Sequence, residues 1–363
     1  KLNYFLIKNT FLFCVFLLSY FSSISQEIVL PGINQLETII NNLQGKKIGV
    51  VANQSSILRE SNKNQHLVDY LIQNKIDIEK VFAPEHGFRG EAANGADIQD
   101  GIDAATGLKV HSLHGKHKKP QPEHLVGIDV VVFDIQDVGA RFYTYVSTLM
   151  LVMEACAEAG VDMIVLDRPN PHGHHVQGPM LDPALKSFVG WVPTPMVHGM
   201  TLGELALMAQ HQGWFEGAEN LSLQVIPCLG WDHDTPYELS VRPSPNLPTS
   251  ASIDLYPSLC LFEPTAISVG RGTDAPFEVL GHPTASFGSY AFTPRPVTGA
   301  APNPKHNGKT CYGQSLDEMA MGWRRQQQLD LGTPLPGFSL EPLWAWADMW
   351  RVTHDGTLEG FIT

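Results

Sequence analysis

Residues 129–145 read DVVVFDIQDVGARFYTY, and the first five of them decide the fold. The run DVVVF at 129–133 is apolar without interruption after its aspartate, as expected for a strand buried on both faces inside a parallel sheet. Residues 144–159 then carry a helical pattern of apolar side chains, and Gly160 is placed to end that helix. A buried strand followed by a helix is the repeating unit of an open, mostly parallel sheet.

The same alternation continues on both sides of this stretch. Apolar runs predict strands at 47–52 (KIGVVA), 79–83, 108–113 and 163–166, and helical spacing predicts a helix at 66–73. The sequence therefore predicts an α/β fold built on a Rossmann-like, doubly wound parallel sheet, and the chain length leaves room for a smaller second domain. Neither a GxGxxG nor a GxxxxGK[ST] motif follows the first strand, so the phosphate cradle of nucleotide-binding sheets is missing.

The chain divides into four predicted regions. Residues 1–25 combine a basic start, an uncharged apolar run and small residues near the end. This pattern is typical of a secretory signal peptide and predicts an exported protein, either periplasmic or extracellular. Residues 26–190 are expected to form the Rossmann-like catalytic domain, and residues 191–283 a proline-rich continuation that completes the site. Residues 284–363 are expected to form the smaller C-terminal domain, with a helix near 315–328.

The charge balance disfavours several classes of partner. The net charge is −13, which argues against binding to nucleic acid or to anionic membrane surfaces. After residue 25 no apolar run approaches the roughly 18–20 residues of a membrane-spanning helix, so no stable membrane insertion is expected. Four cysteines remain beyond Cys14, too few for a disulfide scaffold, and they show no CxxC pairing.

Polar and titratable residues follow the predicted strands at the points where the apolar runs stop. Open parallel sheets bind ligands in the crevice beyond the carboxyl ends of their strands. The residues found there are Asn53, Glu85 with His86, Asp134 with Gln136, and Asp167 with Arg168. Strand ends meet water and are polar in many proteins, but four in succession favour a ligand site.

Glu85 is the candidate general acid. Pro84 fixes the exit from the strand and Gly87 permits a tight turn, which places a partly desolvated carboxyl at the floor of the crevice. A helix N-cap or a salt bridge to Arg89 is the alternative role for this carboxyl, and the residues alone do not decide between the two.

The segment 133–145 and the motif LDRPNP at 166–171 hold further candidates. Six candidate side chains lie in 133–145, between a core strand and a core helix: Asp134, Gln136, Asp137, Arg141, Tyr143 and Tyr145. One or two can be structural, for example in a buried bridge from Asp137 to Arg141, but a structural role for all six is not expected. In an acidic protein an anionic substituent of a substrate needs a local cation, and Arg168 or Arg141 is best placed to bind it.

A metal-dependent reaction finds support only in His172, His174 and His175, which form the sequence HGHH. Neighbouring histidines in a loop rarely converge on one ion, and no HExxH spacing accompanies them. The GxSxG elbow of many serine hydrolases is also absent. We therefore expect no metal and no other cofactor.

Several stretches of this sequence resemble the exo-β-N-acetylmuramidase family of the NamZ (YbbC-like) type, and they occur in the same order as in that family. They lie within residues 46–283 and include APEHGFRG (83–90), VVVFDIQDVGARFYTYVSTL (130–149), VLDRPNP (165–171) and YPSLCLFEPTAISVGRGTDAPFEVLGHP (256–283). The resemblance implies a Rossmann-like domain joined to a smaller C-terminal domain, with the site between them. It also implies release of terminal N-acetylmuramic acid from the non-reducing end of peptidoglycan fragments, so the Rossmann-like fold does not imply NAD.

The resemblance carries over to individual residues. Glu85 matches the catalytic glutamate of the family's EHG motif, and the implied substrate is a peptidoglycan-derived muropeptide or disaccharide. By similarity, Tyr143, Tyr145, Asp167 and Arg168 would line the sugar pocket. With the candidates from the residues themselves, the predicted catalytic residues are Glu85, Tyr143 and Tyr145, and the predicted substrate-binding residues are Asn53, His86, Asp134, Gln136, Arg141, Asp167, Arg168, Asn170 and Arg271.

The chain departs from the family pattern at three places. EPTA at 263–266 stands where the family reads EGTN, and HGHH at 172–175 replaces an apolar-Gly-Gly stretch. The match weakens in 284–363, which resembles a divergent or truncated domain. Two alternatives stay open: a non-catalytic cell-wall sugar-binding protein with the same fold, and a metal-dependent hydrolase that uses HGHH. The intact Glu85 and FYTY motif disfavour the first of these.

Overall fold

A seven-stranded sheet organises the larger part of the molecule. The computed structural model describes residues 28–60, 63–89, 100–284, 288–329 and 337–363, so the predicted signal peptide at 1–25 lies outside the described residues. The sheet has the order β5-β6-β4-β1-β7-β8-β9, and its neighbours pair in parallel except β5 with β6. Its strands are β1 (Lys47–Ala52), β4 (Asp77–Ala83), β5 (Gly101–Ile102), β6 (Lys109–Ser112), β7 (Val130–Asp134), β8 (Asp162–Leu166) and β9 (Leu223–Ile226).

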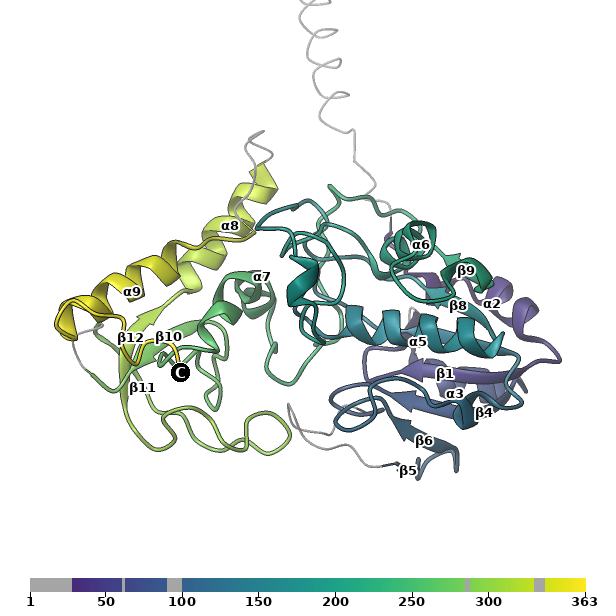
Figure 1. Ribbon diagram of the computed structural model, residues 1–363. Helices are drawn as coiled ribbons and strands as arrows, with labels where there is room; N and C mark the ends of the chain where they lie inside the picture. Colours follow the sequence, from purple (N-terminus) through teal and green to yellow (C-terminus); the bar gives the residue numbers. More distant parts are fainter. Residues whose placement is uncertain (1–27, 61–62, 90–99, 285–287, 330–336) are drawn as a thin grey trace, which may run out of the picture.

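Helices cover both faces of this sheet (Figure 1). They are α2 (Leu36–Leu43) and α3 (Leu67–Gln73) on one face, and α4 (Pro122–Leu125), α5 (Tyr145–Ala159) and α6 (Leu202–Gln212) on the other. The central strand β7 shows why its sequence is apolar throughout. Val131 and Phe133 pack with α5 and α6, whereas Val130 and Val132 pack with α2 and α3. Burial on both faces requires an uninterrupted apolar run, and the predicted doubly wound α/β fold is confirmed.

Helix α5 begins close to the carboxyl end of β7 and sets the position of the polar segment between them. It ends, as expected, at Gly160, whose φ of +65° is a left-handed conformation that favours glycine. Residues 135–144 therefore form a short connection at the edge of the sheet where the parallel strands end. Phe142, Tyr143 and Thr144 at the end of this connection, and Tyr145 on the first turn of α5, lie at the crevice beyond that edge.

The sheet extends past residue 190, where the Rossmann-like domain was expected to end. β9 pairs in parallel with β8, although it lies within the stretch expected to be a proline-rich continuation. The same stretch contains α6 and α7 (Ser250–Leu259). Residues 279–282 form β10, which pairs with β12 of the C-terminal part.

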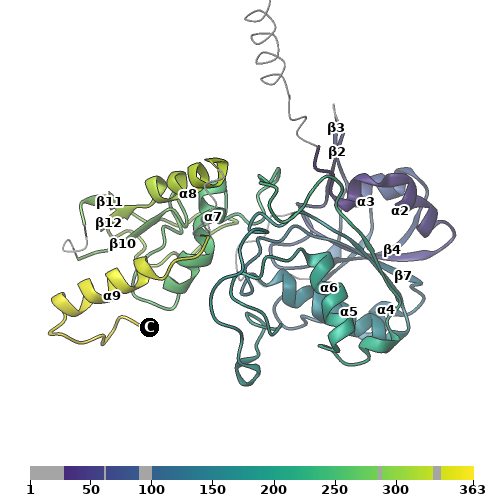
Figure 2. The same cartoon turned by 90° about the horizontal axis from the view of Figure 1, so that it is seen from above.

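The C-terminal part is an antiparallel sheet of order β10-β12-β11, packed with three helices. Its elements are α7, β10 (Val279–His282), β11 (Tyr290–Phe292), β12 (Cys311–Ser315), α8 (Asp317–Leu329) and α9 (Glu341–Thr353). The helix expected near 315–328 is α8, whereas α9 and the small sheet were not predicted. Figure 2 shows this part beside the larger sheet, with loops between the two.

The remaining short elements lie mostly in loops. They are the hairpin of β2 (Ile57–Glu60) and β3 (Lys63–His66) and the 3₁₀ turns η1 (Gly32–Asn34), η2 (Pro183–Leu185), η3 (Ala218–Asn220) and η4 (Cys260–Phe262). Within the described ranges, none of the helices combines the length and the apolarity needed to cross a bilayer.

Candidate active site

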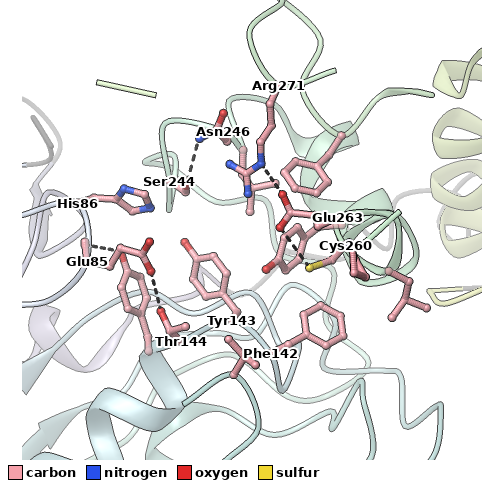
Figure 3. Close-up of a pocket in the computed structure, with 17 residues that line it drawn as sticks. Glu85, His86, Phe142, Tyr143, Thr144, Ser244, Asn246, Cys260, Glu263 and Arg271 are labelled. Atoms are coloured by element: carbon pink, nitrogen blue, oxygen red, sulfur yellow. Dashed lines mark hydrogen bonds and ion pairs between the residues drawn. The ribbon is translucent and has the colours of Figure 1, made fainter. Parts of the chain in front are cut away.

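A pocket of about 450 Å³ lies between the two parts of the molecule (Figure 3). One wall comes from the loop after β4 and from the start of α5, and the other comes from α7 and the loop before β10. The lining residues with polar or aromatic side chains are Glu85, His86, Phe142, Tyr143, Thr144, Tyr145, Ser244, Asn246, Tyr256, Cys260, Glu263, Arg271 and Phe277. Both halves of the chain are therefore needed to form the pocket.

Glu85 reaches the pocket through a tight turn at the end of β4. His86 and Gly87 both have a left-handed backbone, with φ of +72° and +79°, and the Gly87 amide donates to the Pro84 carbonyl at 3.0 Å. A left-handed conformation is unfavourable for a non-glycine residue such as His86, and such strain concentrates at functional sites. The turn directs the Glu85 carboxylate into the pocket, where Thr144 Oγ1 donates to its Oε2 at 3.1 Å.

Two tyrosines from the start of α5 lie beside Glu85. Asn53 Nδ2 donates to the Tyr145 hydroxyl at 2.9 Å, and this hydroxyl is 3.4 Å from the Glu85 carbonyl oxygen. The two rings meet edge to face, 4.9 Å apart. Among the described residues the buried Tyr143 hydroxyl has no hydrogen-bond partner. Burial raises the pKa of both hydroxyls, so Tyr143 and Tyr145 stay protonated and can donate hydrogen bonds.

The opposite wall presents an arginine. Arg271 Nε donates to Glu263 Oε1 at 2.6 Å, and the guanidinium lies over the Phe277 ring with 4.9 Å to its centroid. Burial lowers the pKa of Arg271, but the charge and the hydrogen bond of Glu263, with smaller contributions from Tyr256 and Cys260, together outweigh it, so the pKa is raised and the group stays cationic. Its Nη1 is buried and has no hydrogen-bond partner among the described residues. A fixed cation with an unused donor can bind an anionic substituent of a ligand.

Five of the twelve residues expected in the site line this pocket: Glu85, His86, Tyr143, Tyr145 and Arg271. Asn53 lies just behind them, bonded to Tyr145. Arg89, which the sequence offered as an alternative salt-bridge partner of Glu85, pairs with Asp69 and Asp103 at 3.1 and 2.9 Å.

The other expected binding residues are held by contacts within the protein and do not line the pocket. Arg168 Nε and Nη2 donate to Asp134 at 2.5 and 3.0 Å, and both side chains are buried. Asp167 accepts from Thr201 Oγ1 and from the Gly203 amide, at the start of α6. Partners within the protein thus occupy the Arg168 donors and the Asp167 acceptor oxygens that a substrate would need.

Three more expected residues bind main-chain oxygens. Gln136 donates to the carbonyls of Asp137 and Pro169, and Asn170 donates to that of Met200. Arg141 donates to the Pro179 and Thr194 carbonyls, so the expected bridge from Asp137 to Arg141 is not formed. Asp137 instead accepts from the Gly139 amide at 2.7 Å, and burial raises its pKa to about 7.

The HGHH histidines do not bring three ligand atoms together. His172 Nδ1 lies 2.7 Å from the Val138 carbonyl oxygen. His174 and His175 pack ring against ring at 3.8 Å, and burial lowers their pKa to about 4 and about 3. Across the described ranges, the three-residue group of His, Cys, Asp or Glu close enough to hold an ion is a different one, Asp100, His111 and His124.

Sequence reasoning missed most of the second wall. Glu263, Tyr256 and Phe277 all lie in the stretch 256–283 that carried the resemblance, yet only Arg271 was selected from it. Thr144 was also missed, although it lies between the two tyrosines. Contact with the pocket depends on how the C-terminal part meets the sheet, and local sequence gives no signal of that.

Comparisons with known proteins find the same family along most of the chain. Residues 48–251 match the family model "Exo-beta-N-acetylmuramidase NamZ, N-terminal", and residues 254–332 match "Exo-beta-N-acetylmuramidase NamZ, C-terminal". The peptidoglycan beta-N-acetylmuramidase NamZ of Bacillus subtilis is 41% identical over 297 residues, which cover 76% of this chain and 68% of that protein.

Two crystal structures of DUF1343 family proteins from Bacteroides fragilis share the fold. One has a TM-score of 0.73 and 38% identity, and covers 91% of this chain and 98% of its own. The other has a TM-score of 0.74 and 26% identity, and covers 92% of this chain and 86% of its own.

Proposed function

Because the chain belongs to the NamZ family of exo-β-N-acetylmuramidases, we propose that its pocket binds the terminal N-acetylmuramic acid of a peptidoglycan fragment and that Glu85 protonates the glycosidic oxygen. The enzyme is an exo-acting glycosidase that releases this sugar from the non-reducing end. The observation that carries the residue assignment is the Glu85 carboxylate, which a strained turn and Thr144 hold in the pocket, opposite a cationic arginine.

The pocket has the dimensions and chemistry of a site for one sugar. Its volume of about 450 Å³ lies toward the lower end of small-molecule sites, which span roughly 300–1,000 Å³. Phe142, Tyr256 and Phe277 offer apolar ring surface, and Asn246 and Ser244 add polar groups. A site of this size fits one sugar at a chain end.

Glycoside hydrolysis needs a proton for the leaving oxygen, and a carboxylic acid supplies it in most glycosidases. Glu85 is suited to this role, since its carboxylate lines the pocket and Thr144 Oγ1 orients it by donating to Oε2. The Tyr143 hydroxyl would gain a hydrogen bond from a bound sugar, which would relieve the cost of a buried, unpartnered donor.

Arg271 is the proposed receptor for the lactyl carboxylate that distinguishes N-acetylmuramic acid from N-acetylglucosamine. Glu263 holds the Arg271 Nε, so the guanidinium is oriented before substrate arrives. The buried Nη1 remains to donate a charge-assisted hydrogen bond. Arg168, favoured for this role on sequence grounds, is instead paired with Asp134 outside the pocket.

We further propose that the protein is exported and acts in the periplasm or outside the cell. The support is the signal-peptide pattern of residues 1–25 together with the substrate, because peptidoglycan lies beyond the cytoplasmic membrane. Nothing in the acidic composition favours a nucleic-acid partner.

The proposed function is tested by incubating the protein with the disaccharide MurNAc-GlcNAc and detecting free N-acetylmuramic acid by mass spectrometry. GlcNAc-MurNAc, in which the order of the sugars is reversed, is the control and should stay intact. Longer glycan strands ending in N-acetylmuramic acid should lose one sugar at a time. Internal cleavage of those strands, or no release from the disaccharide by a folded protein, would overturn the proposal.

Arg271→Ala is expected to lower kcat/KM on muramic substrates by about 10–150-fold and to affect matched N-acetylglucosamine substrates much less. This range corresponds to the loss of one charged hydrogen bond, about 1.5–3 kcal/mol. The measurement is kcat/KM for a pair of aryl glycosides that differ only in the lactyl group. Arg324→Ala, an arginine paired with Asp254 outside the pocket, is the matched control.

A second variant separates attraction from repulsion at this site. Arg271→Ala leaves Glu263 without its cation, and that carboxylate could by itself repel an anionic substrate. Arg271→Ala combined with Glu263→Gln removes this repulsion, and discrimination should still be lost. Equal losses on both aryl glycosides would instead mean that Arg271 serves only to hold the pocket wall.

EDTA is expected to leave hydrolysis of MurNAc-GlcNAc unchanged. Proton donation by a carboxyl already activates the leaving oxygen, so no step requires a Lewis acid. His174→Ala combined with His175→Ala should likewise cost little activity, since neither ring lines the pocket. The check is kcat at 25 °C before and after exhaustive dialysis against chelator. Loss of turnover that zinc restores would require a metal-assisted mechanism.

A further inference from the structure

Three side chains from separate segments meet at the β5–β6 edge of the large sheet, away from the residues that line the pocket. Asp100 directly precedes β5, His111 lies on β6, and His124 lies on α4. We call these three residues the edge cluster. Each can offer one ligand atom, and these atoms all lie within 4.8 Å of one another. Figure 1 shows β5 and β6 at this margin of the sheet.

The members of the edge cluster contact one another directly. His111 Nδ1 lies 2.9 Å from Asp100 Oδ2, and the rings of His111 and His124 stack with centroids 4.1 Å apart and planes inclined by 24°. Asp100 is exposed, whereas both histidines are half-buried. A ligand can therefore enter from solvent on the carboxylate side.

Other residues orient each member. The second oxygen of Asp100 accepts from the Ser112 amide at 2.9 Å. His124 Nδ1 accepts from the Gln121 amide in the capping box of α4, which leaves its Nε2 for another partner. The Phe82 ring lies beside both imidazoles. Such outer contacts fix ring orientation in metal sites and strengthen binding.

Two imidazoles and a carboxylate are a ligand set that zinc and related ions use. Zinc bonds to imidazole nitrogen and carboxylate oxygen at about 2.0–2.2 Å, so two ligands of a tetrahedral site lie roughly 3.3 Å apart. The ligand atoms of the edge cluster lie within 4.8 Å of one another, so binding an ion requires them to close by about 1.5 Å at most. We propose that Asp100, His111 and His124 bind one divalent transition-metal ion of the zinc class, with water as the fourth ligand.

The local charge is mixed but compatible with a cation. Glu123 adds an acidic group next to His124, while Lys80 directs its ammonium group to the His124 carbonyl oxygen at 2.8 Å. That ammonium group is thus held by the end of α4. Bound metal would join the segment before β5, strand β6 and helix α4, so it would stabilise this edge of the sheet. None of the three ligands lines the catalytic pocket, so turnover does not depend on the ion.

The test uses the full-length protein without a polyhistidine tag, stripped with EDTA and then titrated. Zinc should bind with a stoichiometry of one and raise the melting temperature, and Co²⁺ should give visible absorption bands of a low-symmetry site. Mg²⁺ and Ca²⁺, which prefer oxygen-only sites, should do neither. Titration calorimetry, absorption spectra and thermal melts supply the readouts.

Variants identify the ligands. His111→Phe keeps a ring in the stack, and His124→Gln keeps an acceptor for the capping box. Loss of a residue that only orients a metal ligand weakens binding roughly 10–100-fold, and loss of a ligand itself should weaken zinc binding by more than this in each variant. His117→Asn, which removes an exposed histidine of the same segment, is the matched control and should bind as wild type does. Circular dichroism checks that each variant folds.

Each result of the zinc-binding experiment either supports or overturns the proposed site. Binding of one ion that is lost in both cluster variants and kept in His117→Asn supports the site. Zinc binding that is equal in all four proteins would mean that surface histidines bind the ion adventitiously. Absence of binding by the wild-type protein would mean that His111 and His124 only stack as aromatic rings. Either of these last two results overturns the proposal without affecting the assignment of Glu85.

Discussion

Glu85→Gln is expected to lower kcat on MurNAc-GlcNAc by about 10²–10⁴-fold while the protein stays folded. Glutamine keeps the shape of the side chain and can still accept from Thr144 Oγ1, but it has no proton to deliver to the leaving oxygen. Because the change removes an interaction made in the transition state, kcat should fall and KM should change little. The measurement is the initial rate of N-acetylmuramic acid release over a range of disaccharide concentrations.

Glu79→Gln is the matched control for this experiment. Glu79 lies on the same strand, β4, but its carboxylate pairs with Lys47 at the surface, and its loss should not change turnover. An activated aryl glycoside gives a second reading, since its leaving group needs little protonation and should be cleaved by Glu85→Gln with a smaller deficit. Wild-type turnover of the disaccharide by Glu85→Gln would remove Glu85 from the mechanism.

Arg168→Met is expected to lower the free energy of unfolding by about 3–5 kcal/mol, because it leaves Asp134 as a buried charge without a partner. Asp134→Leu combined with Arg168→Met removes both charges and should recover much of that loss, as replacement of buried pairs by apolar residues does elsewhere. Urea unfolding followed by circular dichroism measures the difference. Activity on the two aryl glycosides should fall in parallel, if at all.

The surface pair of Arg351 and Asp348 provides the control for stability. Both side chains are largely exposed, so Arg351→Met should shift the free energy of unfolding by less than about 1 kcal/mol. If Arg168→Met unfolded like the wild type and lost only its preference for muramic substrates, Arg168 would be the carboxylate receptor that the sequence suggested. That result would also remove this role from Arg271.

Strand β7 and the Arg168–Asp134 pair show which features can be predicted from the sequence and which cannot. Strand β7 could be predicted because two-sided burial leaves a local signature, the unbroken run of valines before Phe133. The partner of Arg168 could not, because Asp134 precedes it by 34 residues and meets it only through the parallel pairing of β7 with β8. The type of a polar residue at a strand end does not tell whether its side chain faces a ligand or a neighbouring strand.

The same limit applies to the site as a whole. Glu85 could be identified as a candidate because the strand, the proline and the turn that position it are contiguous in sequence. Its role in proton transfer stays a prediction. The wall that carries Glu263 and Arg271 depends on how α7 and the loop before β10 meet the sheet, and the edge cluster depends on three segments brought together by the fold. Neither arrangement can be recognised from any short segment of the sequence.

The two walls of the pocket belong to different halves of the chain, with Glu85 before residue 251 and Arg271 after residue 254. Under the proposed roles, bond cleavage is encoded in the first half and choice of sugar in the second. Evolution can then exchange one sugar preference for another by altering α7 and its following loop, while the machinery for proton transfer is inherited unchanged. Chimeras that join the first half of one relative to the second half of another should inherit their substrate preference from the second.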